Sequence, residues 1–501
     1  MKKYLLEITV FISGAVVMIF ELVGSRVMGP YVGTSTFVWT SLIGVILASL
    51  SIGYWLGGKF ADKKASYKIL SLIILMAGVL IGTTTFIKDF VMIMIQEGIS
   101  DIRVGSIIGA IILFALPSIL LGMVSPYAVK LKMNSLDTSG KTVGNLYAIS
   151  TTGSIVGTFS AGFFLIPFLG NTKILLLLAI LLTISSSLIY LKKYWLFKTT
   201  LLLFFLLFNF ITIPSPLIAI EGSVDLDSVD LDTEYSRIWI FNDIDNTTGQ
   251  PIKKLQINTE NNSAMFLEND ELVSQYTKFY RLADHFFPNL KTALMLGGAA
   301  YSYPKDFLNK HESATIDVVE IDPMLTELAR EHFRLVDDPK MNIIHEDGRT
   351  YLNTTEKKYD VILGDAFTSF YSIPYQLSTV EAVEKTYDLL NDNGVVILNI
   401  ASAIEGDGGK FLRAELATYQ EIFPQTYIFP VIEKDDGEKF QNIILVAIKS
   451  DQPAELTSLN KEFDGYLSNL WTKDIPNDMP ILTDDHAPVD YYINEAINEI
   501  F

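Results

Sequence analysis

The chain has 501 residues, half of them hydrophobic, with no cysteine and a formal net charge of −19. This length exceeds one ordinary core, so we expect two or more domains. The missing cysteines exclude disulfides, a thiolate nucleophile and cysteine metal sites, and the acidic balance argues against a nucleic-acid binder, which needs basic patches to meet the phosphates.

Apolar windows long enough to cross a bilayer, roughly 18 residues or more, recur in the first part of the chain. They predict seven spans, at about 5–28, 37–58, 69–87, 104–129, 143–168, 172–191 and 199–218. Because further spans follow and no small-residue cleavage site comes after the first, we do not expect a removable signal peptide. Residues 1–218 are therefore predicted to form a multi-pass α-helical domain in the lipid bilayer of the cell membrane.

Basic residues are distributed unevenly over the loops between these spans. The side that holds the N-terminus has most of them: Lys2, Lys3, Lys59, Lys63, Lys64, Lys68, Lys130, Lys132, Lys141, Lys192, Lys193 and Lys198. The other side has chiefly Lys88, Arg103 and Lys173. The positive-inside rule places the N-terminus in the cytoplasm. Seven crossings would then put everything after residue 218 outside the cell, and one crossing fewer would reverse that side.

Two ionisable residues lie near the outer end of the first span, Glu21 and Arg26 in IFELVGSRVMGPYVG. Charged groups in a bilayer are costly and are usually paired or functional, so a site facing the helix bundle is one interpretation. The other is an interfacial pair whose side chains reach up to water.

After the spans the composition changes abruptly to the acidic, polar stretch VDLDSVDLDTEYS. We place a linker at residues 219–234. Short strands around the turn-forming DNTTGQP then predict a small β subdomain with a lead-in helix at 235–290. From 291 to 501, buried-strand runs such as TALMLG, TIDVVEI and YDVILGDA alternate with helical stretches. This alternation predicts an α/β, Rossmann-like domain with a mainly parallel sheet covered on both faces.

Ligands on such sheets bind beyond the carboxyl ends of the strands. Gly297 and Gly298 follow the first strand, Glu320 the second, Asp347 the third and Asp365 the fourth. The third glycine of a dinucleotide fingerprint is missing, so a phosphate cradle is not expected. One carboxylate can accept both ribose hydroxyls and another the exocyclic amine of adenine, and together they suit an adenosyl ligand that carries a sulfonium. Singly, each acid could instead cap a helix or be a solvated loop residue.

Other candidate sites carry less information. The five histidines lack the HExxH spacing of zinc hydrolases, so we expect no metal. Asp484 and Asp485 in LTDDHAPVD either border a substrate pocket or cap a helix. Four aromatic residues follow Asp365, and they wall an apolar substrate, form a lid or pack within their own loop: Phe367, Phe370, Tyr371 and Tyr375.

Several of these stretches, in this order, resemble the spermidine synthase (polyamine aminopropyltransferase) family. They are FELVGSRVMGPYVG, LGGAAYSYP, VVEIDPMLTELARE, HEDGRTYL, YDVILGDAF and LTDDHAPVD. The multi-span first half is similar to that of membrane-fused bacterial members. Many methyltransferases share the acidic strand ends, but the β subdomain and the phrase EIDP favour the aminopropyltransferases.

The resemblance implies polyamine biosynthesis, with decarboxylated S-adenosylmethionine as co-substrate. A small-molecule amine would attack the carbon beside the sulfonium, and methylthioadenosine would leave. Glu320 would bind the ribose, Asp347 the adenine, and Asp365 would be the catalytic acid at the reaction centre. The implied cofactor-binding set also includes Gly297, Gly298, Ile321 and Gly348, and the implied substrate-binding residues are Tyr276 and Tyr375. A homodimer, without metal, is the expected assembly.

The chain departs from the family pattern at three positions. Ala300 stands where the glycine turn usually carries an aspartate, Thr277 follows Tyr276 in place of a histidine, and Thr368 replaces the second aspartate of the catalytic loop. A threonine cannot act as a base near neutral pH, so Asp365 would have to take over that role. Losing the acid at Ala300 favours S-adenosylmethionine itself as donor. The alternative is a non-catalytic membrane transport or sensing protein with a degenerate ligand-binding domain.

Overall fold

A computed structural model of the chain describes residues 4–99, 101–133, 139–190, 194–208, 228–258, 260–366 and 373–500. The chain divides into two compact units. The first comprises residues 1–224 with the segment 230–237, and the second comprises 225–229 with 238–501. Each unit is described in turn below.

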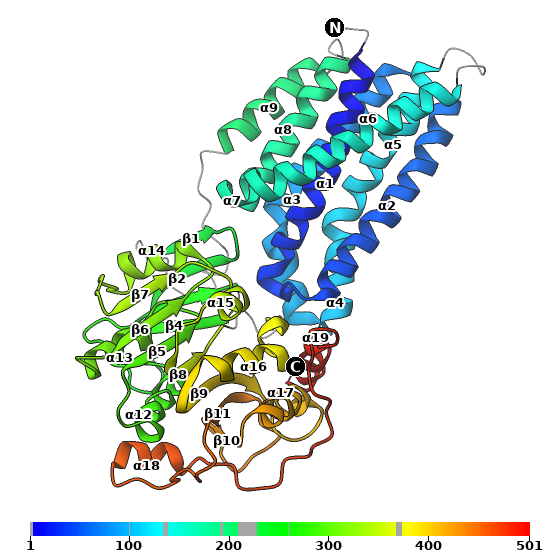
Figure 1. The fold of residues 1–501 in the computed structure, drawn as a ribbon. Helices are drawn as coiled ribbons and strands as arrows, with labels where there is room; N and C mark the ends of the chain where they lie inside the picture. Colours follow the sequence, from blue (N-terminus) through cyan, green and yellow to red (C-terminus); the bar gives the residue numbers. More distant parts are fainter. Residues whose placement is uncertain are drawn as a thin grey trace. The chain divides into compact units, whose positions relative to one another are not determined.

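The first unit is a bundle of long apolar helices (Figure 1). Within the described ranges, six helical stretches are long and apolar enough to cross a membrane. They are α1 (Leu5–Val32), α2 (Thr36–Lys63), α3 (Tyr67–Gly98), α4 to α5 (Ile102–Lys132), α6 to α7 (Ser139–Phe168) and α8 (Asn171–Ile189). The seventh predicted span corresponds to a shorter apolar helix, α9 (Trp195–Phe208), and its residues 209–218 lie outside the described part of the chain.

Glycine allows the closest helix contacts in this bundle. A Cβ atom added at Gly153 of α6 would lie 2.1 Å from the carbonyl oxygen of Phe11 in α1, and one at Gly53 of α2 would lie 2.2 Å from that of Ile119 in α5. Both distances are far below van der Waals contact. Packing of this kind, through small residues that let backbones touch, is characteristic of helices in membranes.

Helix α9 packs along α3, with contacts from the first turns of α3 to its middle. The Lys198 ammonium donates to Ser71 Oγ at 2.8 Å and to the carbonyl of Tyr190 at 2.9 Å, at the end of the bundle where α8 finishes. Ten residues later, the ring of Phe208 meets that of Phe86 at a centroid distance of 4.6 Å. The described part of α9 therefore runs along α3 from Ser71 to Phe86, away from the end of the bundle where α8 finishes.

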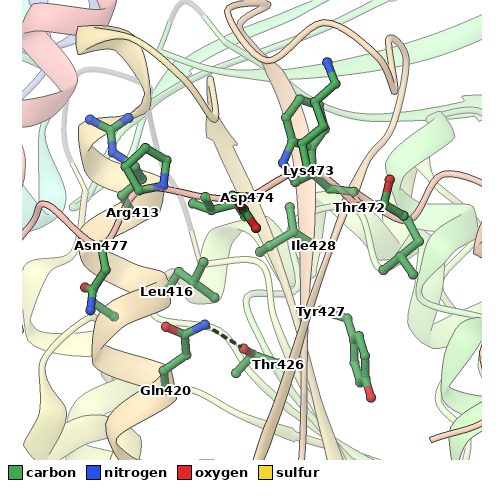
Figure 2. A pocket seen from close by; sticks show the side chains of 15 residues that line it. Arg413, Leu416, Gln420, Thr426, Tyr427, Ile428, Thr472, Lys473, Asp474 and Asn477 are labelled. Atoms are coloured by element: carbon green, nitrogen blue, oxygen red, sulfur yellow. Dashed lines mark hydrogen bonds between the residues drawn. The ribbon is translucent and has the colours of Figure 1, made fainter.

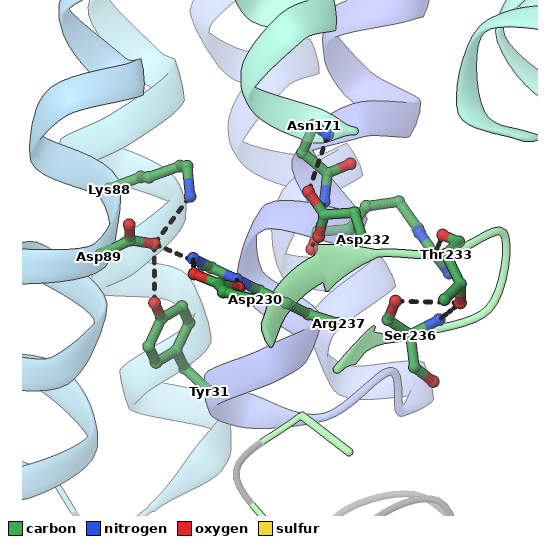
Figure 3. A network of polar contacts seen from close by, with 10 residues as sticks. Tyr31, Lys88, Asp89, Asn171, Asp230, Asp232, Thr233, Ser236 and Arg237 are labelled. Atoms are coloured by element: carbon green, nitrogen blue, oxygen red, sulfur yellow. Dashed lines mark hydrogen bonds and ion pairs between the residues drawn. The ribbon is translucent and has the colours of Figure 1, made fainter. Parts of the chain in front are cut away.

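The segment 230–237 binds the end of the bundle where α1 finishes and α8 begins, through a buried ion-pair network (Figure 3). The Arg237 guanidinium donates to Asp89 Oδ1 of α3 at 2.9 Å and to Asp230 Oδ1 at 3.0 Å. The Tyr31 hydroxyl of α1 donates to the same Asp89 oxygen at 2.7 Å, and the Lys88 ammonium does so at 2.7 Å. The Arg237 side chain is only 11% exposed, so its charge depends on these partners.

Two more contacts hold the same segment. Asp232 accepts from the backbone and side-chain nitrogens of Asn171, the first residue of α8, at 3.0 and 3.1 Å. Arg26 of α1 donates to the carbonyls of Thr233 and Tyr235 at 2.7 and 2.6 Å. Arg26 therefore anchors this segment at the end of the bundle, a role that neither interpretation of Glu21 and Arg26 anticipated.

The chain then builds a four-stranded sheet in the order β1-β2-β3-β4, as the turn signals predict. Its strands are β1 (Val229–Asp232), β2 (Arg237–Ile244), β3 (Pro251–Ile257) and β4 (Glu260–Phe266), with β2, β3 and β4 paired antiparallel. Two short helices, α11 (Gln275–Phe279) and α12 (Leu282–Phe286), lead into the large sheet.

The large sheet has seven strands in the order β10-β11-β9-β8-β5-β6-β7. The strands are β5 (Thr292–Leu296), β6 (Thr315–Val319), β7 (Met341–Ile344), β8 (Tyr359–Gly364), β9 (Leu390–Ser402), β10 (Gln425–Pro430) and β11 (Gln441–Ile448). The first five pair in parallel, and β10 and β11 add an antiparallel edge. The predicted mainly parallel, Rossmann-like sheet is confirmed.

Helices connect the strands and cover the sheet (Figure 1). They are α13 (Ser302–Lys310), α14 (Pro323–His332), α15 (Gly348–Thr354), α16 (Val380–Leu389), α17 (Lys410–Ile422), α18 (Lys461–Leu467) and α19 (Val489–Ile500). Every residue of β8 is buried, as expected for a central parallel strand covered on both faces. The strand order reverses between β5 and β8, and this switch point is where open α/β sheets bind their ligands.

Candidate functional site

The predicted strand-end residues lie at the carboxyl ends of β5 to β8. Backbone hydrogen bonds link these ends directly: Gly297 N donates to Val319 O at 2.9 Å, and Asp365 N donates to Leu296 O at 2.9 Å. Glu320 N donates in the same way to Ile344 O at 3.0 Å. The residues that follow four successive strands of the chain thus form one continuous edge.

The glycine turn after β5 is tightly folded. Gly297 has a φ of +95°, and a Cβ atom there would lie 2.4 Å from the carbonyl oxygen of Asp365. Ala299 and Tyr301 also adopt positive φ values, 45° and 56°, although they are not glycines. The ring of Tyr301 folds back beneath Gly298, where an added Cβ would come within 2.8 Å of it. Only a residue without a side chain fits at Gly297, so the turn brings bare backbone to the switch point.

Glu320 holds this turn in place. Its Oε2 atom accepts from the backbone nitrogens of Gly298 and Ala299 at 2.8 and 3.0 Å, and its Oε1 accepts from Asp322 N at 3.0 Å. Burial raises the pKa of this carboxyl, against the lowering effect of the amide hydrogen bonds. A carboxylate has about four lone-pair sites, so roughly one remains for a ligand hydroxyl. The turn-holding role is one that the sequence pattern alone does not reveal.

The third strand end carries a helix cap. Asp347 caps α15, since its Oδ1 accepts from Thr350 N at 2.9 Å. Its side chain is half-buried, as is the neighbouring Gly348, where an added Cβ would lie 3.5 Å from Leu377. The capping interpretation of Asp347 therefore applies, and it leaves Oδ2 for a further donor.

Two other predicted residues are less enclosed. Ile321 is half-buried, and Tyr375 is 52% exposed. The predicted loop residues Phe367, Thr368, Phe370 and Tyr371 lie outside the described residues.

Asp365 lies at the centre of a polar cluster. The Tyr276 hydroxyl donates to its Oδ2 at 3.3 Å, and Asn399 Nδ2 of β9 donates to its Oδ1 at 3.1 Å. Burial raises the pKa of the Asp365 carboxyl to about 6, against the lowering effect of the hydrogen bonds from Asn399 and Tyr276 and of the nearby Tyr280 hydroxyl. A carboxylate that titrates near neutral pH is suited to accept a proton from a substrate.

Sequence reasoning missed three members of this cluster, Tyr280, Asn399 and Asn442. Asn442 Nδ2 donates to Asn399 Oδ1 at 3.0 Å, which completes a chain of amides that ends on Asp365. One available signal was the asparagine in the otherwise apolar strand GVVILNIA, because a buried amide in such a strand needs partners.

The closing motif LTDDHAPVD lies beside the third strand end. Asp484 accepts from Arg349 of α15 at 2.7 Å and from Thr379 Oγ1 at 2.7 Å. Arg349 also donates to the carbonyl of Gln376 at 2.8 Å. This ion pair therefore joins the C-terminal turn to the residues just after Asp347, while Asp485 is exposed.

A separate cavity of about 490 Å³ lies between α17, β10 and the loop 470–477 (Figure 2). Gln420 of the helix donates to Thr426 of the strand across it at 3.3 Å. None of the predicted site residues lines this cavity. No cluster of three or more His, Cys, Asp or Glu side chains placed to bind a metal occurs in the described part of the chain.

Comparison with known proteins gives matches over the second unit. A family model described as a spermine/spermidine synthase domain matches residues 278–432, a range that includes every predicted strand-end residue and Asn399. The polyamine aminopropyltransferase of Vibrio vulnificus (strain CMCP6) is 29% identical over 170 residues, 33% of this chain and 54% of that protein. A probable polyamine aminopropyl transferase of Bifidobacterium longum (strain NCC 2705) is 28% identical over 232 residues, 42% of this chain and 51% of that protein.

Among solved structures, a probable spermidine synthase from Corynebacterium glutamicum ATCC 13032 is similar over 50% of this chain and 90% of its own, with 23% identity and a TM-score of 0.41. The chain spans about half the length of the two curated relatives named above.

Proposed function

We propose, because residues 278–432 form a divergent member of the spermidine synthase family, that the chain is a membrane-bound transferase. It would move an aminopropyl or related group from an adenosyl sulfonium donor to a small-molecule amine and release methylthioadenosine. The observation that carries the proposal is the placement of Asp365, a carboxyl with a pKa of about 6, at the switch point beside Tyr276.

Each retained residue has a role in this reaction. The turn at Gly297 and Gly298 would admit the nucleoside to the backbone, with Glu320 on the ribose, Asp347 on the adenine, and Ile321 and Gly348 beside them. The donor is decarboxylated S-adenosylmethionine or S-adenosylmethionine itself, and Ala300 in place of an acid favours the latter.

The transfer step needs one base. The amine nitrogen forms a bond to the carbon beside the sulfonium, the carbon–sulfur bond breaks, and its electron pair remains on sulfur as a neutral thioether. The nitrogen then carries a positive charge and loses a proton to Asp365. Above pH 6 this carboxyl is largely ionised, so it can accept that proton and also stabilise the cations.

The proposal is tested on the purified full chain in detergent. Calorimetric titration with each sulfonium donor, followed by turnover with a panel of di- and polyamines, should show donor binding and release of methylthioadenosine. Asp365→Asn should reduce kcat by about 10²-fold to 10⁴-fold with little change in donor affinity. If neither donor binds, the proposal is overturned. Binding without turnover would favour the non-catalytic sensing alternative, which the similarity to aminopropyltransferases otherwise disfavours.

The membrane arrangement is a second part of the proposal: seven crossings, a cytoplasmic N-terminus and an extracytoplasmic second unit. Hydropathy supports six crossings, and the course of α9 supports a seventh. The network of Asp89, Arg237 and Asp230 adds support, because it holds the segment 230–237 at the end of the bundle opposite the lysine-rich loops. The chain continues from Arg237 directly into the second unit.

Cysteine labelling in intact cells tests this arrangement without background, since the chain has no cysteine. Ser313→Cys in the second unit should react with a membrane-impermeant maleimide before permeabilisation, and Lys64→Cys in a lysine-rich loop should react only afterwards. Both positions are exposed. Reaction of Ser313→Cys only after permeabilisation would place the second unit with the cytoplasmic donor pool and reverse the proposed side.

A further inference from the structure

The Asp365 carboxylate is held by a two-amide relay from neighbouring strands. We propose that Asn399, oriented by Asn442, is the positioning residue that fixes this carboxylate for proton transfer. The inference rests on the proposed function, because it assigns Asp365 as the base.

The relay crosses three adjacent strands. Asn442 on β11 donates from Nδ2 to Asn399 Oδ1 on β9 at 3.0 Å, and Asn399 donates from Nδ2 to Asp365 Oδ1, just past β8, at 3.1 Å. The order β11-β9-β8 makes these strands neighbours in the sheet. Asn399 is 6% exposed, so an amide there is costly unless both of its ends are bonded.

The first amide determines the orientation of the second. Because the Asn442 nitrogen occupies the Asn399 oxygen, Asn399 presents its NH₂ group, and not its carbonyl, to Asp365. If the Asn399 amide were flipped, its Oδ1 atom would face Asp365 Oδ1, and the two oxygens would repel each other. The relay therefore specifies a donor toward the carboxylate.

The two carboxylate oxygens are held from different sides. Asn399 binds Oδ1, and Tyr276 binds Oδ2 at 3.3 Å. This arrangement fixes the plane of the carboxylate and stabilises its ionised form. The groups that act on the Asp365 pKa are Asn399, Tyr280 and Tyr276, and burial opposes all three. Removing the Asn399 donor should thus leave burial less opposed and raise that pKa.

The test follows kcat/KM against pH for the full chain in detergent. Asn399→Ala should move the acidic limb up by about one pH unit, Asn442→Ala by less, and Asn399→Asp by more, since a second carboxylate would oppose ionisation of the first. Asn342→Ala, an exposed asparagine on β7 of the same sheet, is the matched control and should leave the limb unchanged. A residue that only supports the fold would lower the amount of folded protein without moving the limb.

A second readout does not need turnover. The Tm of the wild type should fall relative to that of Asp365→Asn between about pH 4 and pH 6 and then level off. The reason is that folding raises the pKa of this carboxyl and therefore favours its protonated form. In the Asn399→Ala background, the decrease should extend to about pH 7. If turnover is absent but the pH at which the Tm difference levels off moves, the proposed function fails, and only the effect of Asn399 on the ionisation of Asp365 is established. If Asn399→Ala leaves the pH at which the Tm difference levels off unchanged, the positioning role is overturned.

Discussion

A Cβ atom at Gly297 would lie 2.4 Å from the carbonyl oxygen of Asp365, so the turn after β5 and the end of β8 touch through backbone alone. Gly297→Ala should therefore separate the two halves of the switch point. We expect a loss of about 2–4 kcal/mol in the free energy of unfolding, from the clash together with the positive φ, and a loss of donor binding. Thermal unfolding and calorimetric titration measure the two effects.

Gly249 is the matched control for this substitution. Its φ is +70°, but nothing lies within 4 Å of an added Cβ. Gly249→Ala thus introduces backbone strain without a clash and should cost about 1 kcal/mol. Equal losses for the two variants would show that the contact between Gly297 and Asp365 is not a tight one.

Glu320 is predicted to act on the donor indirectly as well as by contact, because its oxygens accept three backbone amides. Glu320→Gln replaces one acceptor oxygen with an NH₂ group that would face those amides. We expect destabilisation by about 1–3 kcal/mol and a fall in donor affinity of at least about tenfold. Glu312→Gln, an exposed change, is the control. Weaker donor binding at unchanged Tm would indicate a direct ribose contact without the turn-holding role.

The strand ends could be predicted from the sequence because one physical rule brings them together. Parallel strands place their carboxyl ends at one edge, so Gly297, Glu320, Asp347 and Asp365 needed only a correct reading of the strands. The orientation of each carboxylate followed from no such rule. Glu320 turns toward amides of its neighbouring loop, and Asp365 toward Asn399, which lies on the adjacent strand but 34 residues further along the chain.

Hydropathy predicted the apolar helices for a similar reason, since length and composition suffice to identify a span. It could not predict what holds the segment 230–237. Its acidic residues are typical of a linker. In the structure, however, Asp230 binds Arg237 and Asp232 binds Asn171. Such a role depends on which basic and amide groups the folded bundle offers, and a local pattern contains no information on that.

Glu415 on α17 is predicted to make the protein less stable as pH rises. Burial raises the pKa of this carboxyl to about 8, and its Oε2 atom has no hydrogen-bond partner among the described residues. Because the folded-state pKa is higher than the ordinary value of 4.5, folding favours the protonated form, and stability falls from about pH 4.5 until it levels near pH 8.

Glu415→Gln should remove this dependence, since a neutral amide replaces the carboxyl. At pH 8 the variant should be more stable than the wild type by about 2–4 kcal/mol, with little difference at pH 4.5. Tm measured across this range in detergent tests the prediction, with Glu421→Gln on the exposed side of the same helix as control. Parallel curves for wild type and Glu415→Gln would contradict it.

The ion pair between Arg237 and Asp89 is predicted to contribute strongly to the stability of the first unit. Asp89 accepts from Arg237, Tyr31 and Lys88 at one oxygen, and its side chain is 18% exposed. Arg237→Ala would leave a poorly solvated carboxylate with fewer partners, at a cost of about 3–5 kcal/mol. Arg103→Ala, which breaks an exposed pair with Asp101, should cost less than about 1 kcal/mol.

A double-mutant cycle separates this pair from its surroundings. Asp89→Asn in the Arg237→Ala background should cost less stability than Asp89→Asn alone, because the interaction between the two residues is already lost. The measurement is thermal or denaturant unfolding of the full chain in detergent. Strictly additive losses would mean that Arg237 and Asp89 stabilise the bundle independently, and that the segment 230–237 is held there chiefly by Asn171 and Arg26.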